Sequence, residues 1–185
     1  MKKICEYAHS WIKEYVKEND VVVDFTMGNG HDTLVLSQIV NKGQVFAFDI
    51  QSIALENTKN KLDKYNIKHV ALILDGHENI DSYLSKFKAG IFNLGYLPSG
   101  NKTITTKKDT TILAIRKALD LLEVKGLLAL VVYPGHLEGR EESKAILSFV
   151  CCLDNHDYDV AKFSLENKKD APYIIFIEKL RAIIS

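Results

Sequence analysis

The sequence has no excess of charge of either sign and no long hydrophobic run. Its 24 basic and 24 acidic residues cancel, whereas proteins that grip long nucleic acids by the backbone usually carry a basic excess. Any contact with nucleic acid must therefore come from a local patch. No apolar run approaches the length that spans a bilayer, so we expect no membrane partner. The first residues lack a signal-peptide core, and we expect a cytoplasmic protein.

Cysteine is also scarce. Cys5 and the adjacent pair Cys151 and Cys152 form neither a metal-binding spacing nor an even disulfide framework, so we expect no metal site and a reducing compartment. Buried thiols are the favoured interpretation, because free cysteine behaves as a small apolar residue. With 185 residues, 46% of them hydrophobic, the chain is long enough for one well-buried core. We therefore expect a single domain over residues 1–185.

Short β-branched runs alternate with segments of helical periodicity. The expected strands are 21–25, 45–49, 70–74, 90–94, 126–133, 158–165 and 173–178. Helices are expected at 2–18, 32–40, 52–65 and 80–87, then after a cap at Asp109 or Thr110, and at 138–151. Gly43 suits a left-handed helix end. This order predicts an α/β, doubly wound, seven-stranded sheet that is mostly parallel, with a C-terminal antiparallel hairpin and an added N-terminal helix at the sheet edge.

The most specific stretch is 21–33, an apolar strand that ends in Asp24 and turns through Gly28 and Gly30 into a helix. Backbone amides at such a turn can approach a ligand closely. A dinucleotide site would place a third glycine where Thr33 stands, and an acid beside a pyrophosphate would be repelled. The turn therefore favours a ligand with a cationic head.

Polar residues follow the first four expected strands: Asp24, then Asp49, then Asp75 with Gly76 and His77, then Asn93. Ligands of doubly wound sheets bind outside the carboxyl ends of the strands. These residues therefore predict one crevice, in which Asp49 is placed to accept ribose hydroxyls.

The same residues resemble the motifs of class I S-adenosylmethionine-dependent methyltransferases. The run 24–30 matches the acid and glycine-rich turn of their first motif, except that Thr26 stands where a glycine is common. The resemblance implies a Rossmann-like class I methyltransferase fold and S-adenosylmethionine as cofactor, with Asp49 on the ribose and Asp75 facing the adenine amino group. The residues expected around the cofactor are Asp24, Thr26, Gly28, Asn29, Gly30, Asp32, Thr33, Asp49, Ile50, Gln51, Asp75, Gly76, His77 and Asn93.

The fourth strand end indicates the acceptor. The run Asn93-Leu94-Gly95-Tyr96 has the spacing of the Asn-Pro-Pro-Tyr motif of amino-group methyltransferases, with both prolines replaced. An asparagine oxygen and a following carbonyl can accept two hydrogens from an amine, and an aromatic ring can stack on a planar base. The expected catalytic residues are Asn93, Tyr96 and His136. His136 is equally well explained as a capping or solvated residue.

Three runs, 24–33, 93–102 and 133–142, are similar to a small bacterial family long labelled rRNA methylases. Its members are now associated with methylating 5-aminomethyl-2-thiouridine at the tRNA wobble position, so the resemblance implies a tRNA amine substrate. The expected substrate-binding residues are Tyr96, Pro98, Asn101, Lys102 and Arg140, and Lys107 and Lys108 are candidates for further phosphate contacts.

The sequence leaves other functions open. The acceptor could be an rRNA base, a small molecule or a protein, and a module that binds the cofactor or RNA without catalysis has the same motifs. The helix at 2–18 could cover the sheet or pair with a second chain, so a homodimer also stays open.

Overall fold

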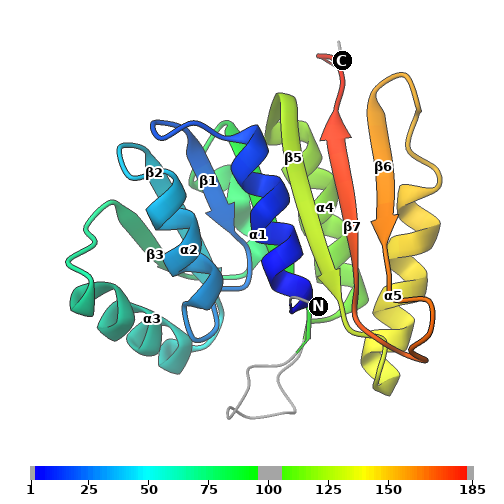
Figure 1. Ribbon diagram of the computed structural model, residues 1–185, viewed down its shortest axis with the longest axis horizontal. Helices are drawn as coiled ribbons and strands as arrows, with labels where there is room; N and C mark the ends of the chain where they lie inside the picture. The colour runs from blue at the N-terminus through cyan, green and yellow to red at the C-terminus, as the bar shows by residue number, and fades with distance from the viewer. Residues whose placement is uncertain (1–2, 96–105, 183–185) are drawn as a thin grey trace.

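A computed structural model describes residues 3–95 and 106–182 of the chain, and within them seven strands form one sheet in the order β3-β2-β1-β4-β5-β7-β6 (Figure 1). The first five strands are parallel, and β7 runs antiparallel to both of its neighbours. The strands are β1 (Val21–Asp24), β2 (Gln44–Asp49), β3 (Val70–Leu74), β4 (Phe87–Asn93), β5 (Leu122–Val132), β6 (Tyr158–Phe163) and β7 (Tyr173–Lys179). The predicted doubly wound sheet with a C-terminal antiparallel hairpin is confirmed.

Helices cover both faces of the sheet. The helices are α1 (Ile4–Tyr15), α2 (His31–Ile39), α3 (Ser52–Lys64), the 3-10 helix η1 (His77–Ser82), α4 (Lys108–Leu121) and α5 (Leu137–Val150). Side chains of α1 and α2 join one apolar cluster on the sheet, side chains of η1, α4 and α5 join a second, and Ala54 of α3 belongs to a small third one. Strand order reverses between β1 and β4, and the carboxyl ends of both strands meet there. In this class of fold that point is where ligands bind.

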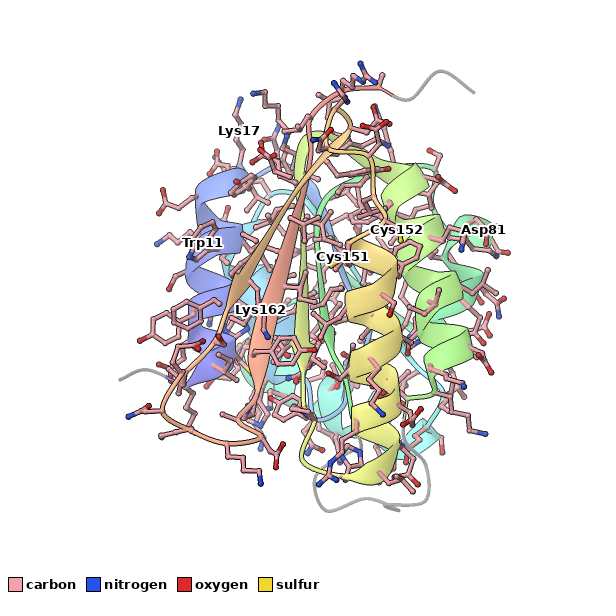
Figure 2. All side chains as sticks on the ribbon, turned by 90° about the vertical axis from the view of Figure 1, so that its right-hand side faces the viewer. Trp11, Lys17, Asp81, Cys151, Cys152 and Lys162 are labelled. Carbon is pink, nitrogen blue, oxygen red and sulfur yellow. The ribbon has the colours of Figure 1, made fainter. Side chains whose placement is uncertain are left out.

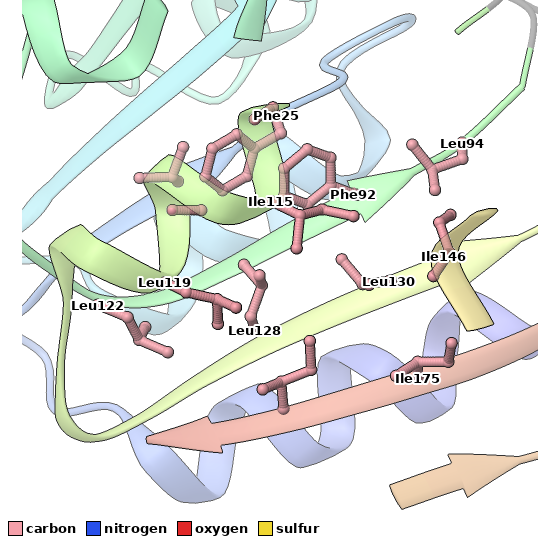
Figure 3. Close-up of a cluster of buried hydrophobic side chains, with 14 of the residues drawn as sticks. Phe25, Phe92, Leu94, Ile115, Leu119, Leu122, Leu128, Leu130, Ile146 and Ile175 are labelled. Carbon is pink, nitrogen blue, oxygen red and sulfur yellow. The ribbon is translucent and has the colours of Figure 1, made fainter. Parts of the chain in front are cut away.

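The larger core cluster lies under α4 and α5 and extends to the carboxyl ends of β1 and β4 (Figure 3). Phe25 and Phe92 stack with ring centroids 4.0 Å apart, and both are almost fully buried. Ile115 and Ile146 contribute to the same cluster from the two helices. Because close-packed aromatic rings tolerate little displacement, this cluster gives the two strand ends a rigid support.

Helix α1 packs on the middle of the sheet and not at its edge, which corrects the prediction. Ala8 and Ile12 are fully buried against residues of β4, β5 and β7, and Trp11 stacks on Phe176 of β7 with centroids 4.6 Å apart. The apolar face of α1 is therefore used largely within the chain, although Trp11 stays 46% exposed.

Several predicted boundaries were wrong. The expected helix at 80–87 is the short η1, and β4 begins earlier, at Phe87. β5 begins at Leu122, which pairs with Phe87 of β4 ahead of a register shift between Phe87 and Ala89. The cap of α4 is Lys107, with no side-chain hydrogen bond, so neither Asp109 nor Thr110 has that role.

The two C-terminal cysteines are exposed, contrary to the prediction of buried thiols. Cys151 and Cys152 lie just beyond the end of α5, facing outward (Figure 2), whereas Cys5 is half-buried. None of the helices that the structure describes is both long and apolar enough to cross a membrane.

Gly43 precedes β2 and has a different role from the predicted one. It does not adopt a positive φ; instead a Cβ atom at this position would lie 2.0 Å from the backbone oxygen of Asp20. That oxygen also accepts the hydrogen bond from the Gln44 amide. The absence of a side chain at Gly43 therefore permits the close approach of the chain segments that lead into β1 and β2.

We predict that Gly43→Ala destabilises the protein, because the backbone of 19–20 must move to admit the methyl group. The expected loss in the free energy of unfolding is about 1–3 kcal/mol. Gly135→Ala is the matched control, since its Cβ would have no atom within 4 Å, and its effect should stay within about 0.5 kcal/mol. Urea unfolding measures both, and equal midpoints for the two variants would contradict the role of Gly43.

Candidate active site

The loop between β1 and α2 is organised by the side chain of Asp24. This residue is 0% exposed. Its Oδ1 accepts a hydrogen bond from the Thr26 amide at 3.1 Å, and its Oδ2 accepts one from the Thr33 hydroxyl at 2.6 Å. Between them, Gly28 and Gly30 have φ values of +49° and +70°, which residues with a side chain rarely adopt. One buried carboxylate therefore joins the start of the glycine loop to the first turn of α2.

Asp24 lies beside a second buried acid, Asp32, which is 6% exposed. Burial, reinforced by the charge of Asp32, raises the pKa of Asp24 above its ordinary value. Burial acts on Asp32 in the same direction, but the hydrogen bond and charge of His9 and the hydrogen bond from Asn93 hold the pKa of Asp32 below its ordinary value. Of the two carboxyl groups, Asp32 therefore keeps its negative charge at lower pH.

Thr26, the departure from the common glycine motif, has a defined contact. Its hydroxyl oxygen accepts a hydrogen bond of 2.7 Å from the backbone amide of Asn93. A glycine has no such acceptor. The side chain of Thr26 therefore links the end of β4 to the glycine loop at the point where strand order reverses.

The side chain of Asn93 is held from the side of α1 and α2. Its Nδ2 donates to Asp32 Oδ2 at 2.9 Å and lies 3.5 Å from Cys5 Sγ. Asp32 Oδ1 lies 2.7 Å from His9 Nε2. The side chains of His9 and Asp32 are only 16% and 7% exposed, so solvent screens this pair weakly.

Both residues that replace the prolines of the Asn-Pro-Pro-Tyr motif use their amide hydrogens. The Leu94 amide donates to the Val131 oxygen at 2.9 Å, and the Gly95 amide donates to Thr106 Oγ1 at 3.0 Å. Gly95 has a φ of +142°, which proline cannot adopt. Hydrogen bonds therefore fix this segment in place of proline rings.

Glu142 anchors the far side of that segment. It is 3% exposed, and its carboxylate accepts hydrogen bonds from Thr106 at 2.9 Å and Thr111 at 2.6 Å. Burial raises the pKa of Glu142 in spite of these two bonds. The segment that returns to α4 is thus joined to α5 through a buried acid, which sequence reasoning missed because Glu142 lies within an ordinary helical pattern.

Asp49 is the last residue of β2, and Asp75 directly follows β3. Asp49 accepts hydrogen bonds from the amides of Gly28 at 3.0 Å and Gln51 at 2.9 Å, and burial raises its pKa. The Asp75 carboxylate accepts hydrogen bonds from the side chains of Asn79 and Tyr83. Both bonds lower the pKa of Asp75, and the bond from Asn79 lowers it more. Each carboxylate offers about four acceptor positions, so both retain capacity for a ligand.

His77 is a part-buried imidazole near these acids. Its Nδ1 lies 3.1 Å from the Phe25 carbonyl oxygen, and its ring meets Phe92 edge-on at 5.5 Å. Burial lowers the pKa of His77, so the neutral ring donates from Nδ1 to that oxygen. The tautomer leaves Nε2 as an acceptor.

A cavity of about 750 Å³ lies at these strand ends, a size typical of small-molecule sites. The sequence-predicted residues that line it are Thr26, Gly28, Asn29, Asp32, Asp49, Ile50, Gln51, Asp75, Gly76, His77, Asn93 and His136. Asp24, Gly30 and Thr33 are not part of the lining and support the loop from behind; Arg140 is exposed on α5, also outside the lining. Tyr96, Pro98, Asn101 and Lys102 lie outside the described residues.

Tyr133 and Pro172 also line the cavity, and sequence reasoning missed both. Tyr133 directly follows β5, so the rule that had found the other strand ends could have found it as well. Pro172 comes from the connection between β6 and β7, for which no local pattern indicated a role. Among the described residues, no group of three or more His, Cys, Asp or Glu side chains is arranged to hold a metal ion.

The chain is similar to proteins of known family. The family described as "Putative rRNA methylase" matches residues 45–179. A relative from Arabidopsis thaliana, named tRNA (mnm(5)s(2)U34)-methyltransferase, chloroplastic, is 36% identical over 196 residues, which cover 96% of this chain and 70% of the relative.

Solved structures agree with this match. A "putative rRNA-methylase" from Clostridium thermocellum has a TM-score of 0.94 and 42% identity over 97% of this chain and 99% of its own. A "putative methyltransferase" from Streptococcus mutans, in complex with SAH, has a TM-score of 0.90 and 41% identity over the same shares, 97% and 99%. With a family match over most of the chain and these relatives along nearly its whole length, the chain belongs to the rRNA methylase family.

Proposed function

We propose that this chain is an S-adenosylmethionine-dependent methyltransferase that methylates the amine of 5-aminomethyl-2-thiouridine at the wobble position of tRNA. The observation that carries the proposal is the placement of Asn93, which lines the same cavity as the acids and glycines of the cofactor motifs. A family relative is named for this tRNA position, and another family structure contains SAH.

The cavity fits the proposed cofactor. Asp49 lines the cavity beside the glycine loop, where its carboxylate can accept a ribose hydroxyl, and Gly28 of that loop lines the cavity without a side chain. The acids that surround the site, above all the ionised Asp32, complement a positively charged ligand head. When bound, S-adenosylmethionine supplies the methyl group from its sulfonium centre.

The chain's own contribution to catalysis is to align the acceptor. Asn93 Oδ1 would accept a hydrogen from the amine and direct the nitrogen lone pair toward the methyl carbon. The amine must be neutral to present that lone pair. Alignment of this kind and a preorganised polar site supply most of the lowering of the barrier in group transfers.

The proton released from the methylated amine needs a route out of the site. Water can take it, because the product ammonium loses its proton after transfer and no strong base is required. His136 lines the cavity and stays a candidate acceptor, while Tyr96 stays a candidate for stacking on the base. The predicted roles of the other residues around the cofactor stay proposals of the same kind.

Recognition of tRNA would depend on a local basic surface, because the formal net charge of the chain is zero. Lys107 lines the cavity at the start of α4, Lys108 follows it, and Arg140 is exposed on α5. We propose these residues as the basic rim of the site, and Lys102 stays a candidate from the sequence alone. The proposed substrate also agrees with the cytoplasmic location that the sequence predicts.

The decisive test is nucleoside mass spectrometry of tRNA incubated with the protein and isotope-labelled S-adenosylmethionine. We expect label on a wobble uridine only when the tRNA carries the 5-aminomethyl precursor. An rRNA acceptor is the second candidate, because the family description refers to rRNA. Label in rRNA and none in tRNA would support that candidate and contradict the proposal, and cofactor binding without label in any acceptor would indicate a non-catalytic module.

Removing the Asn93 side chain should separate turnover from cofactor affinity. Asn93→Ala is expected to lower kcat by about 100-fold, because misplacement of the acceptor by 1 Å has an effect of that order, while the Kd for S-adenosylmethionine stays within about threefold. Single-turnover kinetics and calorimetry measure the two quantities. The matched control is Asn79→Ala, which removes a hydrogen bond to Asp75 and should act on cofactor affinity instead. Equal losses of kcat and affinity in Asn93→Ala would exclude the role at the amine.

The basic rim can be tested through salt dependence. In the Lys107→Ala, Lys108→Ala double variant, tRNA affinity should fall on the order of tenfold, and the slope of log K against log salt should lessen by about one for each lysine. A control double variant, Lys42→Ala with Lys86→Ala, removes two exposed lysines next to the amino ends of β2 and β4. If both double variants weaken tRNA binding to the same extent, the proposal that Lys107 and Lys108 bind tRNA is wrong.

A further inference from the structure

The N-terminal helix α1 reaches the active site as well as covering the sheet. Its first turns lie at the carboxyl ends of the parallel strands (Figure 1), where Cys5 approaches the end of β4 and His9 contacts Asp32 in the first turn of α2. Ala8 and Ile12 already bury the apolar side of α1 against the sheet. The hydrogen bond of His9 is therefore additional to the apolar contacts that attach α1 to the sheet.

A chain of hydrogen bonds runs from α1 to the predicted acceptor-binding residue. His9 Nε2 lies 2.7 Å from Asp32 Oδ1, and Asp32 Oδ2 lies 2.9 Å from Asn93 Nδ2. Each oxygen of the carboxylate thus serves a different element, one facing α1 and the other facing β4. Because the side chain of Asp32 is 7% exposed, water offers little competition for either bond.

The charge of Asp32 determines which way the amide of Asn93 faces. An ionised carboxylate can only accept hydrogen bonds, so His9 must donate from Nε2 and Asn93 must present its NH₂ group. The second hydrogen of that group is directed toward Cys5 Sγ at 3.5 Å. With its nitrogen committed to this side, the amide has its oxygen on the opposite side, and no residue that the structure describes donates to it.

We infer that His9 and Asp32 are positioning residues that orient the Asn93 amide so that Oδ1 faces the acceptor amine. The inference rests on the proposed function, since it assumes that Asn93 binds an amine. A reversed amide would present N–H groups to the amine hydrogens and could not align the lone pair. The α1 helix is then part of the catalytic machinery through His9, although it does not contact the reacting atoms.

Two variants test the chain of bonds. His9→Phe removes the donor to Asp32, and Asp32→Asn removes the charge, so that residue 32 can pair with either face of the amide. Both should lower kcat ten- to a hundredfold, on the order expected for a misaligned reactive group. In His9→Phe, which leaves the acids of the site in place, the Kd for S-adenosylmethionine should stay within about threefold. His9→Gln keeps an N–H donor and should restore kcat to within about threefold of the unaltered protein.

His69→Phe is the matched control. His69 is also a part-buried histidine with one hydrogen bond, 2.9 Å to the Ser37 carbonyl oxygen, but it has no contact with Asn93 or Asp32. This variant should lose stability with kcat unchanged. The inference is overturned if His9→Phe keeps full kcat, if it loses cofactor affinity and kcat alike, or if His9→Gln is as slow as His9→Phe.

A spectroscopic measurement separates this inference from the proposed function. The Nδ2 protons of Asn93, identified by their absence in Asn93→Ala, should exchange slowly in the unaltered protein because a buried carboxylate holds them. In His9→Phe and Asp32→Asn they should shift and exchange faster, and His69→Phe should leave them unchanged. If the unaltered protein methylates no tRNA, the proposed function fails, and the orientation of the Asn93 amide is then judged from its Nδ2 proton signals alone. Unchanged signals in both His9→Phe and Asp32→Asn would overturn the inference.

Discussion

The hydrogen bonds that the buried Asp24 carboxylate accepts are the constraint on which the site depends. A buried carboxyl group is stable only with partners, and Thr26 and Thr33 supply them from the two ends of the glycine loop. The hydroxyl oxygen of Thr26 in turn accepts a hydrogen bond from the backbone amide of Asn93. The loop, the start of α2 and the end of β4 are therefore fixed relative to one another, and with them the cofactor side and the acceptor side of the cavity.

Asp24 and Asp32 show how two neighbouring acids can differ in function. Mutual repulsion disfavours two charges in so buried a place, and the surroundings resolve it unequally. Asp24, whose pKa is raised, holds the backbone of the loop together. Asp32, whose pKa is lowered by His9 and Asn93, keeps the charge. Asp32 accepts hydrogen bonds from the side chains of His9 and Asn93, so it can orient both. Asp24 lies behind the loop and contacts neither of them.

The sequence predicted the order of elements and the acids at the strand ends, because apolar periodicity and the strand-end rule depend on local patterns. It could not predict contacts between segments that are distant in sequence. The clash that makes Gly43 necessary involves Asp20, which β1 and α2 separate from it in the sequence, and the role of Thr26 depends on the amide of Asn93. Nothing in the helix of His9 indicates its contact with Asp32. Glu142 is equally hidden from local patterns, because its partners lie on another helix and on the segment that leads into it.

The loss of both motif prolines is explained by the same kind of long-range contact. Proline rings restrict a backbone locally and donate no hydrogen bond. Here the amides of Leu94 and Gly95 donate to Val131 and Thr106, and the buried Glu142 holds Thr106 from behind. The segment after Asn93 is thus restrained by contacts to β5, the chain entering α4, and α5. Gly95 can therefore take a positive φ that proline could not adopt, while Asn93 stays at the end of β4.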